Sequence, residues 1–373
     1  MVGQKPIIED IDGAPPRTPT PKGDEEGPAN PMAMMGAHSI CNHGKGGGNQ
    51  DTYVASSSPS GSKIVLAVFD GHGEQGKSVS QYASEQVVRA LFRHKDLYSN
   101  PASALKAAYL QTQTLIERTQ RFDAQHAGTT AVTVYLHRSR LYIANVGDSR
   151  AVLGRIRFPG ASLCAVDLSS DQRPDREDER SRILSQGGVI HPSPAPIRQP
   201  PGGGLAEVGP PRVWDRTGRC GLCVTRSLGD LSMRPFVIAS PEVSERALTS
   251  RDRLIVVGSD GVWDRMGSQE AVDIASRHRD PAAAACEIAS VARQRWHAET
   301  QGQLSDDITA VVLRLDHDAA RRGHGGVSHP RGRNSADGPT AARAEGRQHH
   351  GGHLPPVASA APVSRGEARL RRR

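Results

Sequence analysis

The chain has 373 residues, a formal charge of +7 and only 4% aromatic residues. Glycine and proline together make up about 17% of it against an average near 12%, which predicts one folded core beside disordered segments. No apolar run is long enough for a membrane-spanning helix, and the first five residues lack both an apolar signal region and a Met-Gly start. Five cysteines, an odd number, favour a reducing compartment over a disulfide scaffold.

The charge is unevenly distributed. Residues 321–373 hold 11 arginines against three acids, a charge of +8, whereas the preceding 320 residues sum to −1. A basic stretch without apolar periodicity predicts a disordered C-terminal tail over 316–373. The functional alternative is attraction of this tail to nucleic acid or to an anionic membrane, or a nuclear address that ends in residues 371–373 (RRR). We expect a monomer in the cytoplasm, with a nuclear location open through the tail.

Residues 37–315 are expected to fold between two less ordered ends. Residues 1–36 contain seven prolines and are predicted to be a disordered N-terminal extension, and 191–211 hold seven more in a Pro/Gly-rich exposed loop. Consecutive strands joined by tight turns over 130–155 favour antiparallel sheets with the helices outside them. In chain order, the pattern predicts a strand at 63–70, helices at 78–95 and 101–121, strands over 130–155, a helix at 175–186, a strand at 254–257, helices from 271 and at 281–296, and a strand at 308–315.

Acids stand repeatedly at the ends of these apolar runs. An acid directly beside a buried strand is costly unless its charge is offset. Several carboxylates that converge at strand ends favour a hard divalent cation such as Mg²⁺ or Mn²⁺, although each Asp taken singly is better explained as a turn or helix cap. His72, two residues after one of these acids, could act as a general acid beside such a centre. The acids are Asp51, Asp70, Asp148, Asp260, Asp306 and Asp307.

Two shorter motifs allow other interpretations. Residues 71–78 (GHGEQGKS) match a nucleotide-binding phosphate loop, but the tightly turned strands argue against the parallel sheet which that loop requires. Cys220 and Cys223 form a C-x-x-C pattern that occurs in redox and zinc sites. No second pair is present, so a structural pair of small side chains is the favoured interpretation.

Seven short blocks of sequence resemble the metal-dependent protein serine/threonine phosphatases of type 2C, in their plant and protist form, and they occur in the order typical of that family. The resemblance covers nearly all of 37–315. Any one block would be weakly specific, whereas seven in order are highly specific. The blocks are 49–51 (NQD), 68–73 (VFDGHG), 128–131 (GTTA), 144–150 (ANVGDSR), 224–230 (VTRSLGD), 258–264 (GSDGVWD) and 306–309 (DDIT).

The resemblance implies a fold and an activity. The fold is an α+β, four-layer αββα sandwich of two antiparallel sheets flanked by helices, with a metal centre at one end. The activity is hydrolysis of phosphoserine and phosphothreonine in phosphoprotein substrates by water activated at two Mg²⁺ or Mn²⁺ ions, without a phosphoenzyme. In the site that the resemblance implies, Asp70 bridges both metals and the Gly71 carbonyl helps to hold one of them. Asp51, Asp260 and Asp306 complete the ligands, and Asp148 joins Asp260 at a weaker third site. His72 is the general acid.

The sequence also departs from the family pattern. Gln50 replaces a common Glu, and Gly46 stands where animal-type members place a phosphate-binding Arg, which leaves the adjacent Lys45 as the candidate phosphate ligand. Asp307 falls where the family often has Asn and is expected to support the ligands. The 191–211 loop lies at the family's variable flap and is a candidate for substrate selection. A catalytically silent binding module and a hydrolase of small phosphoesters remain the rival functions.

Overall fold

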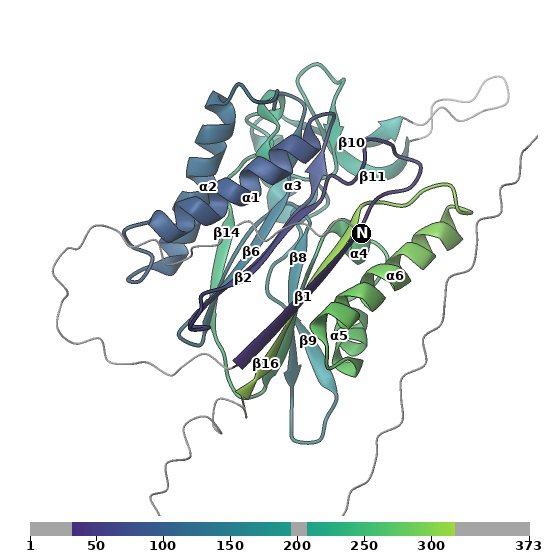
Figure 1. Cartoon of the computed structure of the whole chain (residues 1–373). Helices are drawn as coiled ribbons and strands as arrows, with labels where there is room; N and C mark the ends of the chain where they lie inside the picture. Colours follow the sequence, from purple (N-terminus) through teal and green to yellow (C-terminus); the bar gives the residue numbers. More distant parts are fainter. Residues whose placement is uncertain (1–31, 195–206, 318–373) are drawn as a thin grey trace, which may run out of the picture. The chain divides into compact units, whose positions relative to one another are not determined.

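Two five-stranded antiparallel sheets form the centre of the structure, a computed structural model that describes residues 32–194 and 207–317 (Figure 1). Neighbouring strands in each sheet are hydrogen-bonded in antiparallel register. The first sheet has the order β1 (Met32–Ile40), β16 (Ile308–Asp316), β15 (Asp252–Gly258), β8 (Arg150–Ile156), β9 (Leu163–Asp167). The second has the order β14 (Glu242–Ala247), β7 (Arg140–Val146), β6 (Ala131–His137), β3 (Lys63–Phe69), β2 (Thr52–Ser57).

Three apolar layers hold the sheets and helices together. Leu66 and Val134 of the second sheet pack with Val257 and Val311 of the first in the layer between the sheets. Helices α1 (Gly76–Arg93) and α2 (Pro101–Arg118) cover the outer face of the second sheet, whereas α5 (Ser268–Arg277) and α6 (Pro281–Glu299) cover the first (Figure 1). The expected antiparallel sheets and helices are therefore confirmed, and their arrangement agrees with the expected four-layer sandwich.

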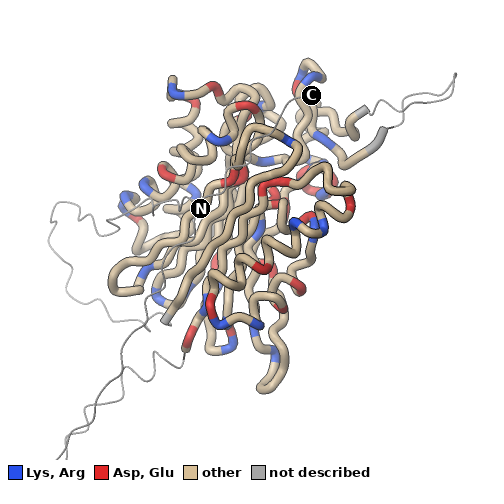
Figure 2. Tube along the Cα trace, turned by 45° about the vertical axis from the view of Figure 1, so that its right-hand side comes forward, with Lys and Arg blue, Asp and Glu red and all other residues tan. Residues whose placement is uncertain are grey.

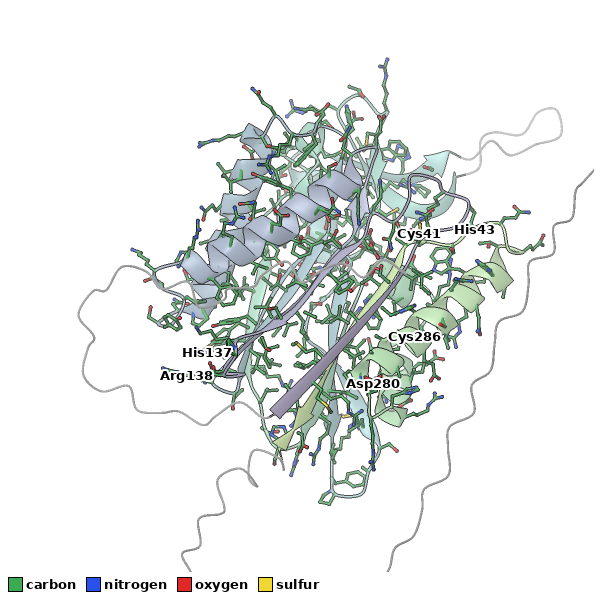
Figure 3. All side chains as sticks on the ribbon, in the orientation of Figure 1. Cys41, His43, His137, Arg138, Asp280 and Cys286 are labelled. Atoms are coloured by element: carbon green, nitrogen blue, oxygen red, sulfur yellow. The ribbon has the colours of Figure 1, made fainter. Side chains whose placement is uncertain are left out.

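Local sequence explains where two of these helices begin. The Asn100 side chain accepts a hydrogen bond from the Ser103 amide (3.0 Å) and caps α2, which starts with a proline. Asp280, labelled in Figure 3, caps α6 in the same way by accepting from the Ala282 amide (3.1 Å). Gly36 on β1 lets α6 approach closely, because a Cβ there would lie 2.1 Å from the Ala282 nitrogen.

Two predicted boundaries are wrong. The strand β1 begins at Met32, inside the predicted N-terminal extension, because its pairing with β16 continues to the end of that strand, where Met32 lies opposite Asp316. Residues 191–211 are not simply a loop: β10 (Val189–Pro194) and β11 (Glu207–Trp214) form a hairpin, which β12 (Gly221–Leu222) extends. Prolines are tolerated because this small sheet has few ladder bonds and a register shift between Pro192 and Pro194. The predicted tail from 318 onward lies outside the described residues.

Several short elements lie outside the two large sheets. A small sheet consists of β4 (Gly71–His72), β5 (Gly128–Thr129) and β13 (Leu228–Gly229), and the 3₁₀ turn η1 (Leu231–Met233) follows it. Helix α3 (Glu177–Ser185) precedes the β10–β11 hairpin, and α4 (Asp260–Trp263) directly follows β15. Among the described helices, none is long and apolar enough to cross a membrane.

Candidate active site

The register of the strands brings one pair of acids from each sheet to the same end of the sandwich. Asp51 directly precedes β2 and Asp70 directly follows β3, and the first residue of β2 pairs with the last of β3. Asp260 follows β15 and Asp306 precedes β16 near the paired residues Gly258 and Ala310. The charges of Asp51, Asp260 and Asp306 all act on Asp70. The four carboxylates therefore form one cluster that spans both sheets.

A pocket of about 800 Å³ opens beside this cluster. Its wall contains residues from the loop before β2, the small sheet, the β11–β12 hairpin, α4 and the end of α6. Asp51 is not on the wall but lies behind it, with 2% of its surface exposed. The structure thus brings together all eight predicted site residues. Those on the wall are Lys45, Asp70, Gly71, His72, Asp148, Asp260 and Asp306.

The acid cluster is electrostatically unfavourable without a cation. Burial, followed by the charges of Asp307 and Asp306, raises the pKa of Asp51 to about 7, and its Oδ1 has no hydrogen-bond partner in the described part of the chain. Burial and mutual repulsion also raise the pKa of Asp70 and Asp260 well above the ordinary range. Buried carboxylate oxygens without partners are the donors that Mg²⁺ and Mn²⁺ prefer, so these residues fit a divalent metal.

A histidine–aspartate pair lies at the edge of the same pocket. His72 Nε2 is 2.7 Å from Oδ2 of the buried Asp230, and this carboxylate also accepts a hydrogen bond from the Ser227 hydroxyl. Burial lowers the pKa of His72, but Asp230 and Asp148 raise it more, so the net pKa lies above its ordinary value. Sequence reasoning did not assign a role to Asp230, whose only signal was its place at the end of the 224–230 block.

The pair depends on a glycine. A Cβ at Gly128, on β5, would lie 2.1 Å from Oδ2 of Asp230 and 2.8 Å from Nε2 of His72. The missing side chain therefore leaves the room in which the imidazole and the carboxylate meet. Asp230 has a left-handed backbone (φ 46°), which turns its side chain back toward β5.

Asp148 has an internal cation as its partner. The Arg173 Nε donates to Asp148 Oδ2 (3.0 Å), and its Nη2 donates to Asp264 (2.6 Å). Burial raises the pKa of Asp148 to about 6 although Arg173 lowers it. Arg173 also lines the pocket, and the sequence analysis did not single it out. A cation at Asp148 would therefore share this carboxylate with a guanidinium.

Lys45 and Asp307 organise the loop before β2. The Lys45 ammonium forms an ion pair with Asp306 and lies 5.9 Å from the centre of the Trp296 ring. Asp307 accepts hydrogen bonds from the Asn42 amide (2.7 Å) and the Gln50 amide (2.9 Å), which agrees with the supporting role expected for it. The positive charge of Lys45 is thus at the pocket, next to an expected metal ligand.

The structure does not support the two alternative motif readings. Lys77 of the phosphate-loop pattern donates to the Asp51 carbonyl (2.8 Å) from the first turn of α1, and the neighbouring strands are antiparallel. Cys220 and Cys223 flank β12 as free thiols, and burial raises the pKa of both, which disfavours the reactive thiolate. The Cys223 side chain belongs to the pocket wall.

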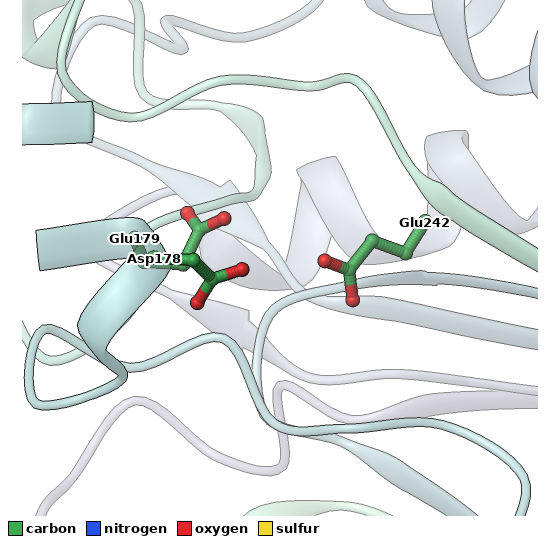
Figure 4. Close-up of side chains that lie close together, drawn as sticks. All are labelled: Asp178, Glu179 and Glu242. Atoms are coloured by element: carbon green, nitrogen blue, oxygen red, sulfur yellow. The ribbon is translucent and has the colours of Figure 1, made fainter. Parts of the chain in front are cut away.

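A second group of carboxylates lies away from this pocket. Asp178, Glu179 and Glu242 approach one another closely enough to hold an ion (Figure 4). Each of them, however, pairs with Arg176, and Glu179 pairs with further arginines. These acids are neutralised by guanidinium groups, so they form a structural ion-pair network.

Solved structures define the class of fold. A serine-threonine phosphatase 2C from Toxoplasma gondii superimposes with a TM-score of 0.61 at 22% identity, over 78% of this chain and 98% of that one. A sex-determining protein from C. elegans gives a TM-score of 0.59 at 19% identity, over 78% of this chain and 66% of that one. The sandwich and its connections are therefore those of phosphatase 2C folds.

Sequence comparison gives the family. A model of the family Protein phosphatase 2C matches residues 32–300. Probable protein phosphatase 2C 59 of Arabidopsis thaliana is 34% identical over 69% of this chain and 71% of its own length. Probable protein phosphatase 2C 35 of the same plant is 35% identical over 72% and 78%. The chain belongs to the protein phosphatase 2C family and is a metal-dependent protein phosphatase, as the sequence blocks predict.

Proposed function

We propose that this phosphatase hydrolyses phosphoserine and phosphothreonine in proteins at a centre of two Mg²⁺ or Mn²⁺ ions. The observation that carries the proposal is the cluster of four carboxylates from both sheets, in which burial and mutual repulsion raise the pKa of Asp51, Asp70 and Asp260. Asp51, Asp70, Asp260 and Asp306 would hold the ions with the Gly71 carbonyl. Asp148 would contribute to a weaker third site, in competition with Arg173.

The chain's own residues have distinct tasks in this proposal. When bound, two divalent cations offset the charge of the phosphoryl oxygens and lower the pKa of a bound water. Asp70 would hold both ions, because it lies on the pocket wall and the charges of Asp51 and Asp260 act on it. The Ser259 hydroxyl donates to Asp51 Oδ2 (2.8 Å) and fixes the orientation of that carboxylate. Lys45 is the candidate ligand for the substrate phosphate at the pocket wall.

His72 supplies the proton that the leaving group needs. A serine or threonine oxygen is a poor leaving group as an alkoxide, so it departs as an alcohol when an acid protonates it. Asp230 holds the proton on Nε2 of His72 and favours the imidazolium. The proton on Nδ1 is then the one available to the departing oxygen.

Hydrolysis of a phosphothreonine peptide tests the proposal. Wild type is assayed with Mn²⁺ or Mg²⁺, with and without chelator, beside Asp70→Asn. We expect activity that requires metal and falls by about three orders of magnitude in the variant, because metal clamps contribute several kcal/mol to transition-state stabilisation. Asp175→Asn is the matched control, since Asp175 lines the same pocket outside the acid cluster and its loss should change activity little.

Two other outcomes would identify the rival functions. A folded, metal-loaded wild type without turnover would indicate a silent binding module. A preference for p-nitrophenyl phosphate over the phosphopeptide in kcat/KM would indicate a hydrolase of small phosphoesters. Either result would contradict the proposal.

A further inference from the structure

The strand ends opposite the acid cluster form one continuous surface. His137 at the end of β6 donates from Nδ1 to the carbonyl of Ser62 (3.3 Å), and the Leu248 amide donates to the Ser139 carbonyl (2.8 Å). These bonds join the β2–β3, β6–β7 and β14–β15 turns. Figure 3 shows His137 and Arg138 at this end of the sheets, away from Cys41 and His43 at the other.

The same surface continues to the first sheet. The Ile156 amide donates to the Arg251 carbonyl (2.8 Å), which joins the β8–β9 hairpin to the β14–β15 turn. His317, which follows β16, donates to the Asp252 carbonyl (2.8 Å). We call this surface, made by the strand ends and turns away from the active site, the basic end.

Arginine dominates the charge of the basic end. It holds eight Lys and Arg residues against three acids, a formal charge of +5. Within this set, Arg140 pairs with Glu245 and Arg155 with Asp252, so the basic side chains outnumber the acids that pair with them. Several of the turns carry Lys or Arg in Figure 2. The residues are Lys63, Arg138, Arg140, Arg155, Arg157, Arg246, Arg251 and Arg253, with Glu245, Asp252 and Asp316.

An exposed aromatic ring lies at the tip of one turn. Phe158, between β8 and β9, has 64% of its surface exposed and directly follows Arg157. An exposed aromatic side chain beside basic residues suits a membrane–water interface, where the ring enters the headgroup region and the cations meet anionic lipids.

The chain continues from the basic end into its most basic segment. Strand β16 ends at Asp316, opposite the first residue of β1, and residues 321–373 carry a charge of +8. The acid cluster lies at the other end of the same strands. A partner bound at the basic end would leave the pocket accessible.

We propose that the basic end is a docking surface for an anionic lipid bilayer, with Phe158 inserted into the headgroup region and the surrounding arginines on the lipid phosphates and carboxylates. The tips of several turns form this surface, so it can contact the flat, charged surface of a membrane. This property goes beyond the phosphatase activity and does not depend on the metal centre.

Vesicle co-sedimentation of the full chain tests the proposal. The probes are vesicles of phosphatidylcholine alone and of phosphatidylcholine mixed with phosphatidylserine, each at low and high salt. We expect binding only to the mixed vesicles and a loss of binding at high salt. Combined Arg138→Glu, Arg157→Glu and Arg251→Glu should weaken binding at least about a hundredfold. Phe158→Ser should weaken it while leaving the salt dependence unchanged.

Matched variants separate this surface from net charge. Arg89, Lys106 and Arg118 are exposed on α1 and α2, and reversal of all three changes the net charge equally. This control should bind vesicles like wild type, and both triple variants should retain phosphopeptide hydrolysis, which shows that they are folded. Absence of binding to the mixed vesicles, equal losses in both triple variants, or binding to duplex DNA or RNA but not to vesicles would each overturn the proposal.

Discussion

The His72–Asp230 pair shows how a small residue elsewhere in the chain determines the geometry of the site. The two side chains are 158 positions apart, and they meet only because β5 presents Gly128 between them. The resemblance assigns His72 from its own block, but the partner and the glycine become apparent only in the folded chain. Their contact depends on the pairing of β4 and β13 with β5.

Gly128→Ala should therefore impair catalysis. The added methyl group would lie 2.1 Å from an Asp230 oxygen, so it should separate Asp230 from His72. If His72 is the general acid, kcat for a phosphothreonine peptide should fall by about 10²- to 10⁴-fold. The measurement is steady-state kinetics on that peptide and on p-nitrophenyl phosphate, whose leaving group needs no proton.

Asp230→Asn provides the conservative comparison. It retains the volume and removes the charge, so it should also slow hydrolysis of the peptide more than that of the nitrophenyl ester. Equal losses on both substrates would contradict a role in leaving-group protonation. An unchanged peptide kcat in both variants would show that the pair is not needed.

Residues next to an apolar strand were the most predictable part of the site. Asp51, Asp70, Asp260 and Asp306 could be identified because each interrupts or borders a buried run, where a charge requires an explanation. Arg173 could not, since it lies in a polar loop and its importance comes from Asp148 and Asp264, which are distant in sequence. Pairwise contacts across the fold leave little trace in one sequence.

At the level of elements, helix α3 is tied to the loop between β12 and β13 by a buried carboxylate. Glu179 is buried and accepts hydrogen bonds from Arg182 (2.7 Å) and from Arg226 (3.0 Å). Burial raises its pKa, but the hydrogen bonds from Arg226 and Arg182 lower it more, so the net pKa lies below the ordinary 4.5. The ion pairs therefore stabilise the fold above that pH and weaken as Glu179 becomes protonated.

Glu179→Gln should cost about 3 kcal/mol of unfolding free energy at neutral pH, because it leaves buried guanidinium groups without a counter-charge. The difference from wild type should shrink as the pH falls below 4.5, since a group with a lowered pKa loses its contribution there. Urea unfolding at several pH values measures both effects. Glu177→Gln, at an exposed position on the same helix, should change stability by less than about 0.5 kcal/mol. A difference that does not vary with pH would contradict this account.

Most elements could be predicted from periodicity, but the β10–β11 hairpin could not. Its strands contain Pro192 and Pro211, and proline ordinarily indicates a break in a strand. Here the hairpin is stabilised by side chains: Trp214 Nε1 donates to the His191 carbonyl (3.0 Å), and the two rings stack. The pairing of β1 with β16 was missed for a different reason, because it joins opposite ends of the folded region.

For the molecule as a whole, the acid cluster is a connection between the two sheets. Asp51 and Asp70 flank strands of the second sheet, whereas Asp260 and Asp306 flank strands of the first. A metal held by all four would therefore link the layers at one end. Without a cation, the same carboxylates repel one another across the sandwich.

Metal should consequently raise the unfolding temperature. At a hundredfold excess over Kd, binding to the folded state alone adds about 2.7 kcal/mol. Differential scanning calorimetry with Mn²⁺ and with chelator measures this increment. Asp70→Asn should lose most of the increment, whereas Asp175→Asn should keep it. An increment that is equal in both variants would place the bound metal elsewhere.

The positions of the tryptophans have an optical consequence. The chain has three: Trp214 stacks on His191 in the hairpin beside the pocket, Trp263 follows Asp260 in α4, and Trp296 lies on the pocket wall. Trp296 also has Lys45 at 5.9 Å and Arg265 at 3.5 Å from its ring centre. Since indole fluorescence responds to nearby charge, titration of Mn²⁺ should change the emission, and Trp296→Phe should remove most of that change. Trp296 would then report metal loading without a substrate or a label.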